Sequence, residues 1–162
     1  MALIIIEGCD GTGKTTLIQS LAAELNLPIV KSYKPRSLVD IDQFDNWANA
    51  CPRPPLCDRH SAISDLVYGP IIRGTTPGTL EHAHAKVNNN FLVYCAPPFT
   101  AVQNNIHVEP QMNGVKDQLR KIYTAYEGLM YDLEPHFQYD YTVPGAYKAL
   151  VTQLMHFLER NR

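Results

Sequence analysis

The sequence predicts an α/β fold, in which a parallel sheet of about five strands is flanked by helices on both faces. Short apolar runs alternate along the chain with longer segments of helical periodicity, and strands that alternate with helices form parallel sheets. The first run, residues 3–6, is apolar throughout, which is typical of a strand buried on both faces. The length of 162 residues suits one domain, so we expect residues 1–162 to form a single domain.

The first half of the chain begins with the apolar strand at residues 3–6, which ends at Gly8. A helix is expected at residues 13–25, because leucines recur there at a spacing of four and so share one face. Pro28 stops this helix. The next expected elements are a strand at 29–33, a helix at 39–50 and a short strand at 56–58.

The second half of the chain begins with a mixed helical stretch at residues 61–72, which Gly69-Pro70 interrupts. Apolar positions then recur at spacings of three and four from Val115 to Leu133, which predicts the most regular helix of the chain. Residues 104–114 have no periodicity, and we interpret them as a mobile loop. The remaining expected elements are helices at 80–87 and 145–158 and strands at 91–96 and 139–143.

Composition and charge exclude several classes of protein. A net charge of −2 argues against a protein that coats a nucleic acid polymer, since such a protein needs a basic stripe. A nucleotide remains compatible, because a few local cations suffice for it. No stretch approaches the ~20 apolar residues of a membrane span, and the apolar start ends too early for a signal peptide. The four cysteines suit reduced thiols, so we expect a cytoplasmic protein without a membrane partner.

The strongest motif is GCDGTGKT at residues 8–15, which matches G-x-x-x-x-G-K-[ST], the P-loop that binds phosphate. Gly11 and Gly13 let backbone N–H groups converge on phosphate without side chains in the way. The helix that follows points its positive end at the same anion. Lys14 would neutralise the β- and γ-phosphates, and the Thr15 hydroxyl can bind Mg²⁺. The motif predicts phosphate binding but does not specify a reaction.

A second polar cluster follows the strand expected at residues 56–58. Asp58 ends that strand and could face a metal ion, as a Walker-B acid does. Arg59 and Arg73 could form a two-pronged clamp on a second phosphate group. The alternative is structural: an ordinary ion pair of Asp58 with Arg59, and a solvated Arg73. These residues alone favour the alternative.

The two motifs together resemble those of a known family. Residues 7–15, EGCDGTGKT, are similar to the E-G-x-D-G-x-G-K-[ST] loop of thymidylate kinases, and Asp58-Arg59 is similar to the D-R-aromatic motif of that family. The order of the elements agrees as well. The resemblance is strong over residues 3–25 and fair over 56–74, and it is closest to the short phage-type members of the group.

The resemblance implies a single P-loop kinase domain that transfers the γ-phosphoryl group of ATP, with Mg²⁺, to a (deoxy)nucleoside monophosphate such as dTMP. Asp10 would lie near the sugar and phosphate of the acceptor, Arg59 and Arg73 would bind that phosphate, and Tyr68 is a candidate to stack on its base. Asp58 would place Mg²⁺ through water. Kinases of this type often form homodimers. The residues implied to bind ATP are Gly8, Gly11, Thr12, Gly13, Lys14, Thr15 and Thr16, with the loop 142–145 near the adenine.

Three departures from the family pattern concern the acceptor and the lid. His60 stands where an aromatic residue is usual, and the Arg-Glu-Pro segment of the family is at best Lys34-Pro35-Arg36 here. Residues 104–121 would form the lid loop and the start of its helix, but this segment has no arginine before Lys116. Lys116 and Arg120, four residues apart on one helical face, are candidates for the missing catalytic cation. A solvated face is an equally good interpretation of these charges.

The reaction leaves alternatives open. A kinase that acts on a nucleoside hydroxyl would need a nearby carboxylate as base, whereas the oxygen of a phosphate monoester is already anionic near pH 7. This favours a monophosphate acceptor over a deoxynucleoside. A catalytically weak nucleotide-binding module is a further alternative, since it would lack the cations of a lid. A regulatory switch is disfavoured, because there is no N-K-x-D segment to recognise guanine.

Overall fold

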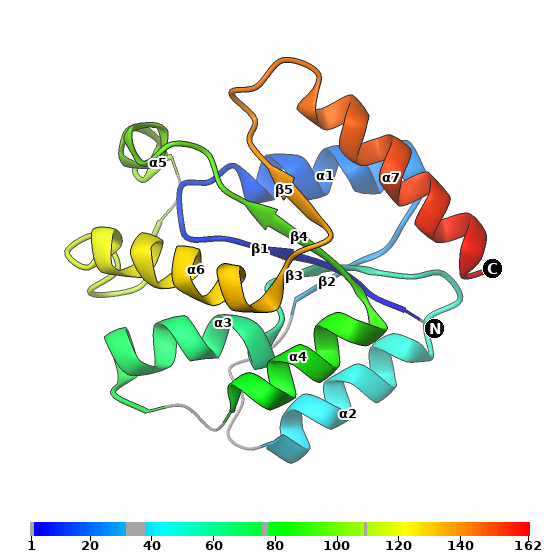
Figure 1. Cartoon of the computed structure of the whole chain (residues 1–162), viewed down its shortest axis with the longest axis horizontal. Coiled ribbons are helices and arrows are strands. Elements are labelled where there is room, and N and C mark those ends of the chain that lie inside the picture. Colours follow the sequence, from blue (N-terminus) through cyan, green and yellow to red (C-terminus); the bar gives the residue numbers. More distant parts are fainter. Residues whose placement is uncertain (1, 32–37, 76–77, 109) are drawn as a thin grey trace.

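A five-stranded parallel sheet forms the centre of the molecule (Figure 1). The computed structural model describes residues 2–31, 38–75, 78–108 and 110–162. The strand order is β2-β3-β1-β4-β5, which confirms the expected fold class. The strands are β1 (Ile4–Glu7), β2 (Ile29–Lys31), β3 (Leu56–Asp58), β4 (Phe91–Cys95) and β5 (Phe137–Tyr139).

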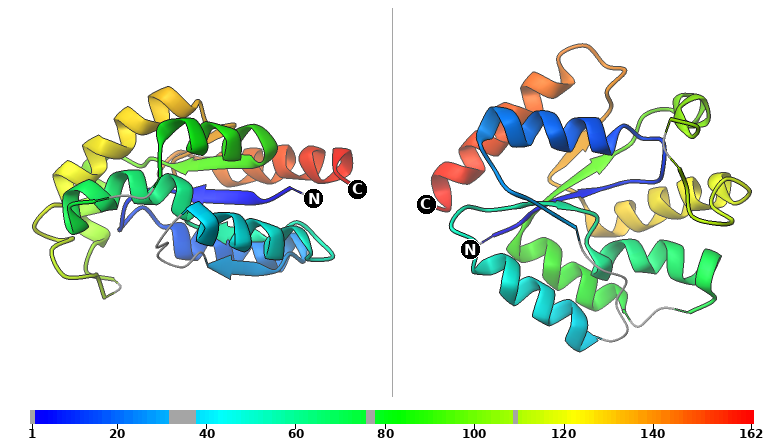
Figure 2. Two further views of the ribbon diagram at one scale, coloured as in Figure 1. Left: turned by 90° about the horizontal axis from the view of Figure 1, so that it is seen from below. Right: turned by 180° about the vertical axis from the view of Figure 1, so that it is seen from behind.

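The helices form two layers, one on each face of the sheet (Figure 1 and Figure 2). α1 and α7 cover one face, whereas α2, α3, α4 and α6 cover the other. The helices are α1 (Lys14–Leu25), α2 (Leu38–Asn49), α3 (Ser61–Tyr68), the π-helical turn η1 (Gly69–Arg73), α4 (Leu80–Asn89), α5 (Phe99–Asn105), α6 (Leu119–Leu133) and α7 (Ala146–Arg160). Within the described ranges, no helix combines the length and the apolar character needed to cross a membrane.

The central strand β1 explains why the first apolar run has no polar alternation. Ile4 and Ile6 pack in the cluster under α1 and α7, whereas Leu3 and Ile5 pack in the cluster on the opposite face. Successive side chains of a strand point to opposite faces, so both sets must be apolar. The sheet thus packs against one apolar core on each of its two faces.

The sheet topology brings two distant segments of the sequence together. The chain leaves β1 for β2 and β3 on one side, and later returns to form β4 and β5 on the other. Ile6 near the end of β1 pairs with Asp58 at the end of β3. Ligands of open α/β sheets bind beyond the carboxyl ends of the strands, where the strand order reverses. The P-loop and the segment that begins at Asp58 meet at this edge.

The two ends of the chain lie at the opposite edge. Ala2 and Asn161 line the same surface groove, and both ends are on the right of Figure 1, away from the P-loop.

The structure differs from the expected bounds in three elements and contains one helix that was not expected. The last strand ends at Tyr139, because the Asp140 carboxylate accepts hydrogen bonds from the backbone N–H and hydroxyl of Thr142 and so forms a turn. The long helix begins at Leu119 and not at Val115. The short helix α5 was not expected at all. The expected strand at 29–33 ends at Lys31, and residues 32 and 33 lie outside the described ranges, as does Lys34-Pro35-Arg36.

Candidate active site

The loop of residues 8–13 connects β1 to α1 at the carboxyl edge of the sheet. Gly11 and Gly13 have positive φ angles of 81° and 80°, a conformation that glycine adopts without steric cost. A Cβ atom on Gly11 would lie 2.7 Å from the carbonyl oxygen of Val102 in α5. The hydroxyl of Thr12 donates to the carbonyl oxygen of Cys9 at 2.8 Å and holds the loop from within. The loop is therefore shaped by its own sequence and by contact with α5.

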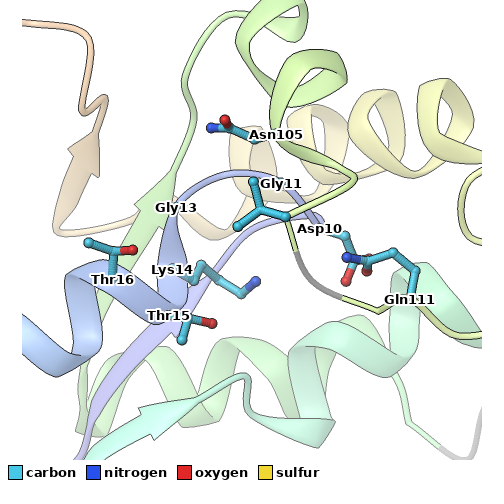
Figure 3. A pocket seen from close by; sticks show the side chains of 9 residues that line it. Asp10, Gly11, Gly13, Lys14, Thr15, Thr16, Asn105 and Gln111 are labelled. Atoms are coloured by element: carbon cyan, nitrogen blue, oxygen red, sulfur yellow. The ribbon is translucent and has the colours of Figure 1, made fainter.

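A cavity of about 180 Å³ lies over the start of α1 (Figure 3). No side chain caps the amino end of this helix, and a helix dipole favours an anion at that end. Five of the residues implied to bind ATP line the cavity, whereas Gly8 and Thr12 shape the loop behind it. The cavity is lined by Asp10, Gly11, Gly13, Lys14, Thr15, Thr16, Asn105, Val108 and Gln111.

Lys14 is nearly buried in this cavity, with 9% of its surface exposed. Burial and the positive charge of Arg59 lower its pKa, whereas the carboxylates of Asp10 and Asp58 raise it. The ammonium group therefore lies in the field of both carboxylates. An anionic phosphate would relieve the repulsion between Lys14 and Arg59.

Asp10 joins the loop to the segment after β3. Its Oδ1 atom is 2.9 Å from Nη2 of Arg59, and its Oδ2 atom accepts a hydrogen bond from the Tyr68 hydroxyl at 2.8 Å. The Arg59 guanidinium also lies 4.8 Å from the centroid of the Tyr68 ring, a cation–π distance. Burial alone would raise the pKa of Asp10, but Arg59 and Lys14 outweigh it, so the pKa is lowered. We call these three residues the acceptor cluster, after the role that the sequence resemblance implies for them.

Glu7 lies beneath the acceptor cluster and is completely buried. Its Oε1 atom accepts from the backbone N–H of His60 at 2.7 Å, and its Oε2 atom accepts from the Tyr126 hydroxyl at 2.9 Å. Burial raises the pKa of Glu7 to about 7, even though Arg59 and these hydrogen bonds lower it. Glu7 thus ties β1 to the segment after β3 and to α6.

His60 is fixed by hydrogen bonds directly after Arg59, which has an unusual backbone conformation. Arg59 has a φ angle of 59°, which costs energy for a residue other than glycine. The fully buried His60 ring accepts from the N–H of Ala62 through Nδ1 and lies 2.5 Å from Oδ1 of Asp45 through Nε2. The Nδ1 contact caps α3 and implies that Nε2 carries the proton. The departure from the family pattern at this position therefore has a local structural role.

The other predicted cations are not assembled around the cavity in this structure. Arg73 forms an ion pair with the buried Asp65, so it and Arg59 are each paired with a carboxylate. The Arg120 guanidinium lies 4.4 Å from the centroid of the Phe99 ring. Lys116 is exposed in the turn before α6, so the expectation that it shares a helical face with Arg120 is wrong. Among the described residues that line the cavity, Lys14 is the only cation.

The Mg²⁺ ligands expected from the sequence are Thr15 and Asp58. Thr15 lines the cavity, and the Asp58 carboxylate influences the pKa of Lys14 and lies 3.9 Å from the exposed Lys31. A hydroxyl and a carboxylate are oxygen ligands that suit Mg²⁺, which usually keeps several waters and needs one or two protein groups besides substrate phosphates. In the part of the chain that the structure describes, no group of three or more histidine, cysteine, aspartate or glutamate side chains is placed to bind a metal ion.

Several residues at the site were not predicted. Asn105, Val108 and Gln111 line the cavity from the segment that begins at the end of α5, and the Asn105 side-chain NH₂ group donates a hydrogen bond to the Tyr141 hydroxyl at 2.7 Å. A signal for α5 is present, because Pro98 precedes apolar residues spaced by three and four, and proline is common at the start of a helix. Only the fold shows that this helix contacts the P-loop.

A parallel sheet whose central strand leads through a P-loop into a helix defines the class of P-loop phosphate-binding proteins. The sequence matches no family model and no curated protein. Solved structures do match. The YorR protein from Bacillus subtilis, in complex with phosphorylated GDP, has a TM-score of 0.73 at 21% identity, over 98% of this chain and 96% of that chain.

Two kinases of small molecules are similar over almost their whole length. Deoxyadenosine kinase from M. mycoides with bound dATP has a TM-score of 0.64 at 13% identity, over 97% of this chain and 99% of that chain. Shikimate kinase from Acinetobacter baumannii in complex with shikimate has a TM-score of 0.59 at 17% identity, over 100% and 95%. At these identities the similarity establishes that this chain has the P-loop kinase fold.

Proposed function

We propose that this chain is a nucleoside monophosphate kinase, which transfers the γ-phosphoryl group of ATP to a (deoxy)nucleoside monophosphate. The resemblance to thymidylate kinases makes dTMP or a related deoxynucleotide the first acceptor to test. The observation that supports the proposal is the position of the acceptor cluster directly beside the P-loop. The Arg59 guanidinium group and the Tyr68 ring thus lie next to a site that is suited to donor phosphates.

Phosphoryl transfer requires in-line placement and cancellation of negative charge, with little covalent chemistry by the protein. In this proposal the P-loop and the amino end of α1 hold the donor phosphates, and Lys14 neutralises the charge on the transferring group. Arg59 holds the acceptor phosphate through parallel N–H bonds, and Tyr68 lies against the acceptor. Mg²⁺ bound near Thr15 and Asp58 would supply further charge neutralisation on the donor phosphates.

Two carboxylates of the site, Glu7 and Asp10, are poorly placed to act as a base, which favours a monophosphate acceptor over a hydroxyl. A hydroxyl must lose its proton, and the base must be within hydrogen-bond reach. Glu7 has no exposed surface, and each oxygen of Asp10 already accepts a hydrogen bond. A phosphate monoester needs no base, because its attacking oxygen is already anionic.

A deoxynucleoside kinase is the second candidate, and the shortage of cations favours it. Lys14 is the only cation among the described cavity-lining residues, and Arg59 and Arg73 are paired with carboxylates. A neutral acceptor would need less positive charge than a phosphate. In that case Asp58, whose side chain is 20% exposed, is the carboxylate to test as the base.

A coupled assay of ADP release against nucleosides and monophosphates separates these candidates. The proposed function predicts turnover with at least one monophosphate, dTMP being the first to test, and none with nucleosides. Turnover with nucleosides alone would replace it by the second candidate. ATP binding without any acceptor-dependent turnover would indicate a catalytically weak nucleotide-binding module.

The substitution Arg59→Ala tests the acceptor cluster. We expect it to weaken monophosphate binding at least about tenfold, as for loss of a charge-assisted contact, and to change ATP binding little. Arg59→Lys should rescue little, because a point charge cannot reproduce a two-pronged contact. Calorimetric titration with each ligand measures both effects. The control is Arg53→Ala, since Arg53 is exposed and bonds only to the carbonyl of Asn26 among the contacts described. Equal losses for both ligands would assign Arg59 to the fold or to the donor.

A further inference from the structure

A second cavity, of about 340 Å³, adjoins the phosphate cavity along α1. This volume is within the range of small-molecule sites, about 300–1,000 Å³. The two cavities share Gly13, Thr16 and Asn105. A ligand whose phosphates occupy the phosphate cavity can therefore extend directly into the second cavity. The second cavity is lined by Gly13, Thr16, Leu17, Ser20, Asn105, Tyr139, Tyr141 and Tyr147.

Tyr141 stands at the boundary between the two cavities. A Cβ atom on Gly13 would lie 3.3 Å from Cδ1 of the Tyr141 ring, so the ring is in contact with the P-loop. Its hydroxyl is 2.7 Å from Nδ2 of Asn105, the last residue of α5. The ring is thus held between the P-loop and α5, yet 40% of the residue is exposed. It is positioned and still accessible to a planar ligand.

The lining of the second cavity is aromatic and carries no charge. Three of its residues are tyrosines, and the cavity follows one face of α1 through Gly13, Leu17 and Ser20. A nucleobase is a flat, uncharged group that stacks on aromatic rings. Because the phosphates of the donor would lie at the start of α1, its base reaches this cavity.

Most of the polar side chains that line the cavity are hydroxyls, which do not favour one purine over another. Thr16, Ser20 and the tyrosines offer hydroxyls, which donate or accept as the ligand requires. The Tyr147 hydroxyl is already bonded to Glu24 at 2.5 Å. The only amide, Asn105, directs its NH₂ group to Tyr141. Strong rejection of an analogue needs a buried polar group that the analogue leaves unpaired, and no lining side chain is committed in that way.

We propose that Tyr141, positioned by Asn105, holds the donor base by stacking, and that the enzyme therefore accepts ATP and GTP alike. This inference rests on the proposed function only for the presence of a nucleoside triphosphate donor. The loop 142–145 was already expected near the adenine; the inference adds the residue that holds the base and the range of bases that the site accepts.

Calorimetric titration with ATP, GTP and inorganic tripolyphosphate tests the inference without an acceptor. The parent protein should bind ATP and GTP with dissociation constants within about threefold of each other, because stacking tolerates any base. Tyr141→Ala should weaken both about tenfold, as expected for a lost stacking contact, and should leave tripolyphosphate binding unchanged. Tyr141→Phe, which keeps the ring, should retain most of the affinity. The control is Tyr131→Ala on α6, since Tyr131 is 85% exposed.

Two outcomes would overturn the inference. An equal loss for tripolyphosphate in Tyr141→Ala would show that Tyr141 only supports the P-loop. A preference of the parent for ATP over GTP of about 100-fold or more would show that hydrogen bonds recognise the base. An incorrect acceptor assignment would leave all of these titrations unchanged, so failure of this inference and of the proposed function can be told apart.

Discussion

Lys14 is the residue through which the donor site acts in the proposed reaction. Lys14→Ala removes the charge that follows the transferring phosphoryl group, so we expect turnover to fall at least about 100-fold. The far-ultraviolet circular dichroism spectrum should not change, because the P-loop is held by glycine geometry and by Thr12. A turnover assay beside the spectrum measures this, with the exposed Lys148→Ala on α7 as control. Near-normal turnover of Lys14→Ala with an intact fold would contradict the P-loop assignment.

The residues of the site differ in how far the sequence predicts them. The P-loop is predictable because its glycines, lysine and threonine are contiguous and each has a local geometric reason. The acceptor cluster is only partly predictable, because the partners of Asp10 are 49 and 58 residues away. The contact of Glu7 with Tyr126 spans 119 residues. Such pairs arise from the order of strands in the sheet, which no local pattern encodes.

The elements follow the sequence best where one face is continuously apolar. α1 agrees almost residue for residue with the periodicity, because its apolar face packs on a core. β3 has the bounds expected for a short buried strand. β5 begins two residues earlier than expected, at Phe137, and ends four residues earlier, at Tyr139, where the turn made by Asp140 follows it. α5 has only seven residues and one buried side chain, Val102, so its periodic signal is short. The missed element is one of the two helices that line the cavity, the other being α1.

The start of α6, together with the turn before it that carries Lys116, is the segment from which we predict the second catalytic cation. We expect it to swing toward the donor phosphates when both substrates are bound, which would separate Arg120 from the Phe99 ring. Of the proposed lid, residues 104–121, only residue 109 lies outside the described ranges. Arg120→Ala or Lys116→Ala should lower turnover, by up to several orders of magnitude for a finger-like cation. ATP binding should change little, because the contact is made mainly in the transition state.

Single-turnover kinetics beside ATP titration measures this prediction, with Lys121→Ala as the matched control on the same helix. Parent rates in both variants would mean that these charges form a solvated face. The second cation would then have to be Arg59, Arg73 or a residue of a partner subunit.

The stability of the whole molecule should depend on pH through Glu7. An exposed glutamate has a pKa near 4.3, whereas burial raises the pKa of Glu7 in the fold to about 7. Between these values the folded state binds more protons than the unfolded chain, so its stability falls as pH rises. The free energy of unfolding should lose about 3 kcal/mol from this group between pH 4 and pH 8. Glu7→Gln, which keeps a carbonyl oxygen for His60, should remove this loss.

Urea unfolding of the parent and of Glu7→Gln at several pH values measures the difference. The control is Glu159→Gln, because Glu159 is exposed on α7 and should not alter the pH dependence. If Glu7→Gln loses stability with pH as steeply as the parent, Glu7 titrates in the fold as it does in the unfolded chain.

Because Ala2 and Asn161 line the same groove, the two ends of the chain lie on the same side of the molecule. Chains whose ends lie close together tolerate circular permutation, provided that the new break falls in an exposed segment. The exposed connection around Arg53, before β3, is such a segment. A permuted chain opened there would begin at β3 and run to α7. A new linker would then lead into β1, the P-loop, α1 and β2. We therefore expect the permuted chain to form the same site, although its elements are synthesised in a different order.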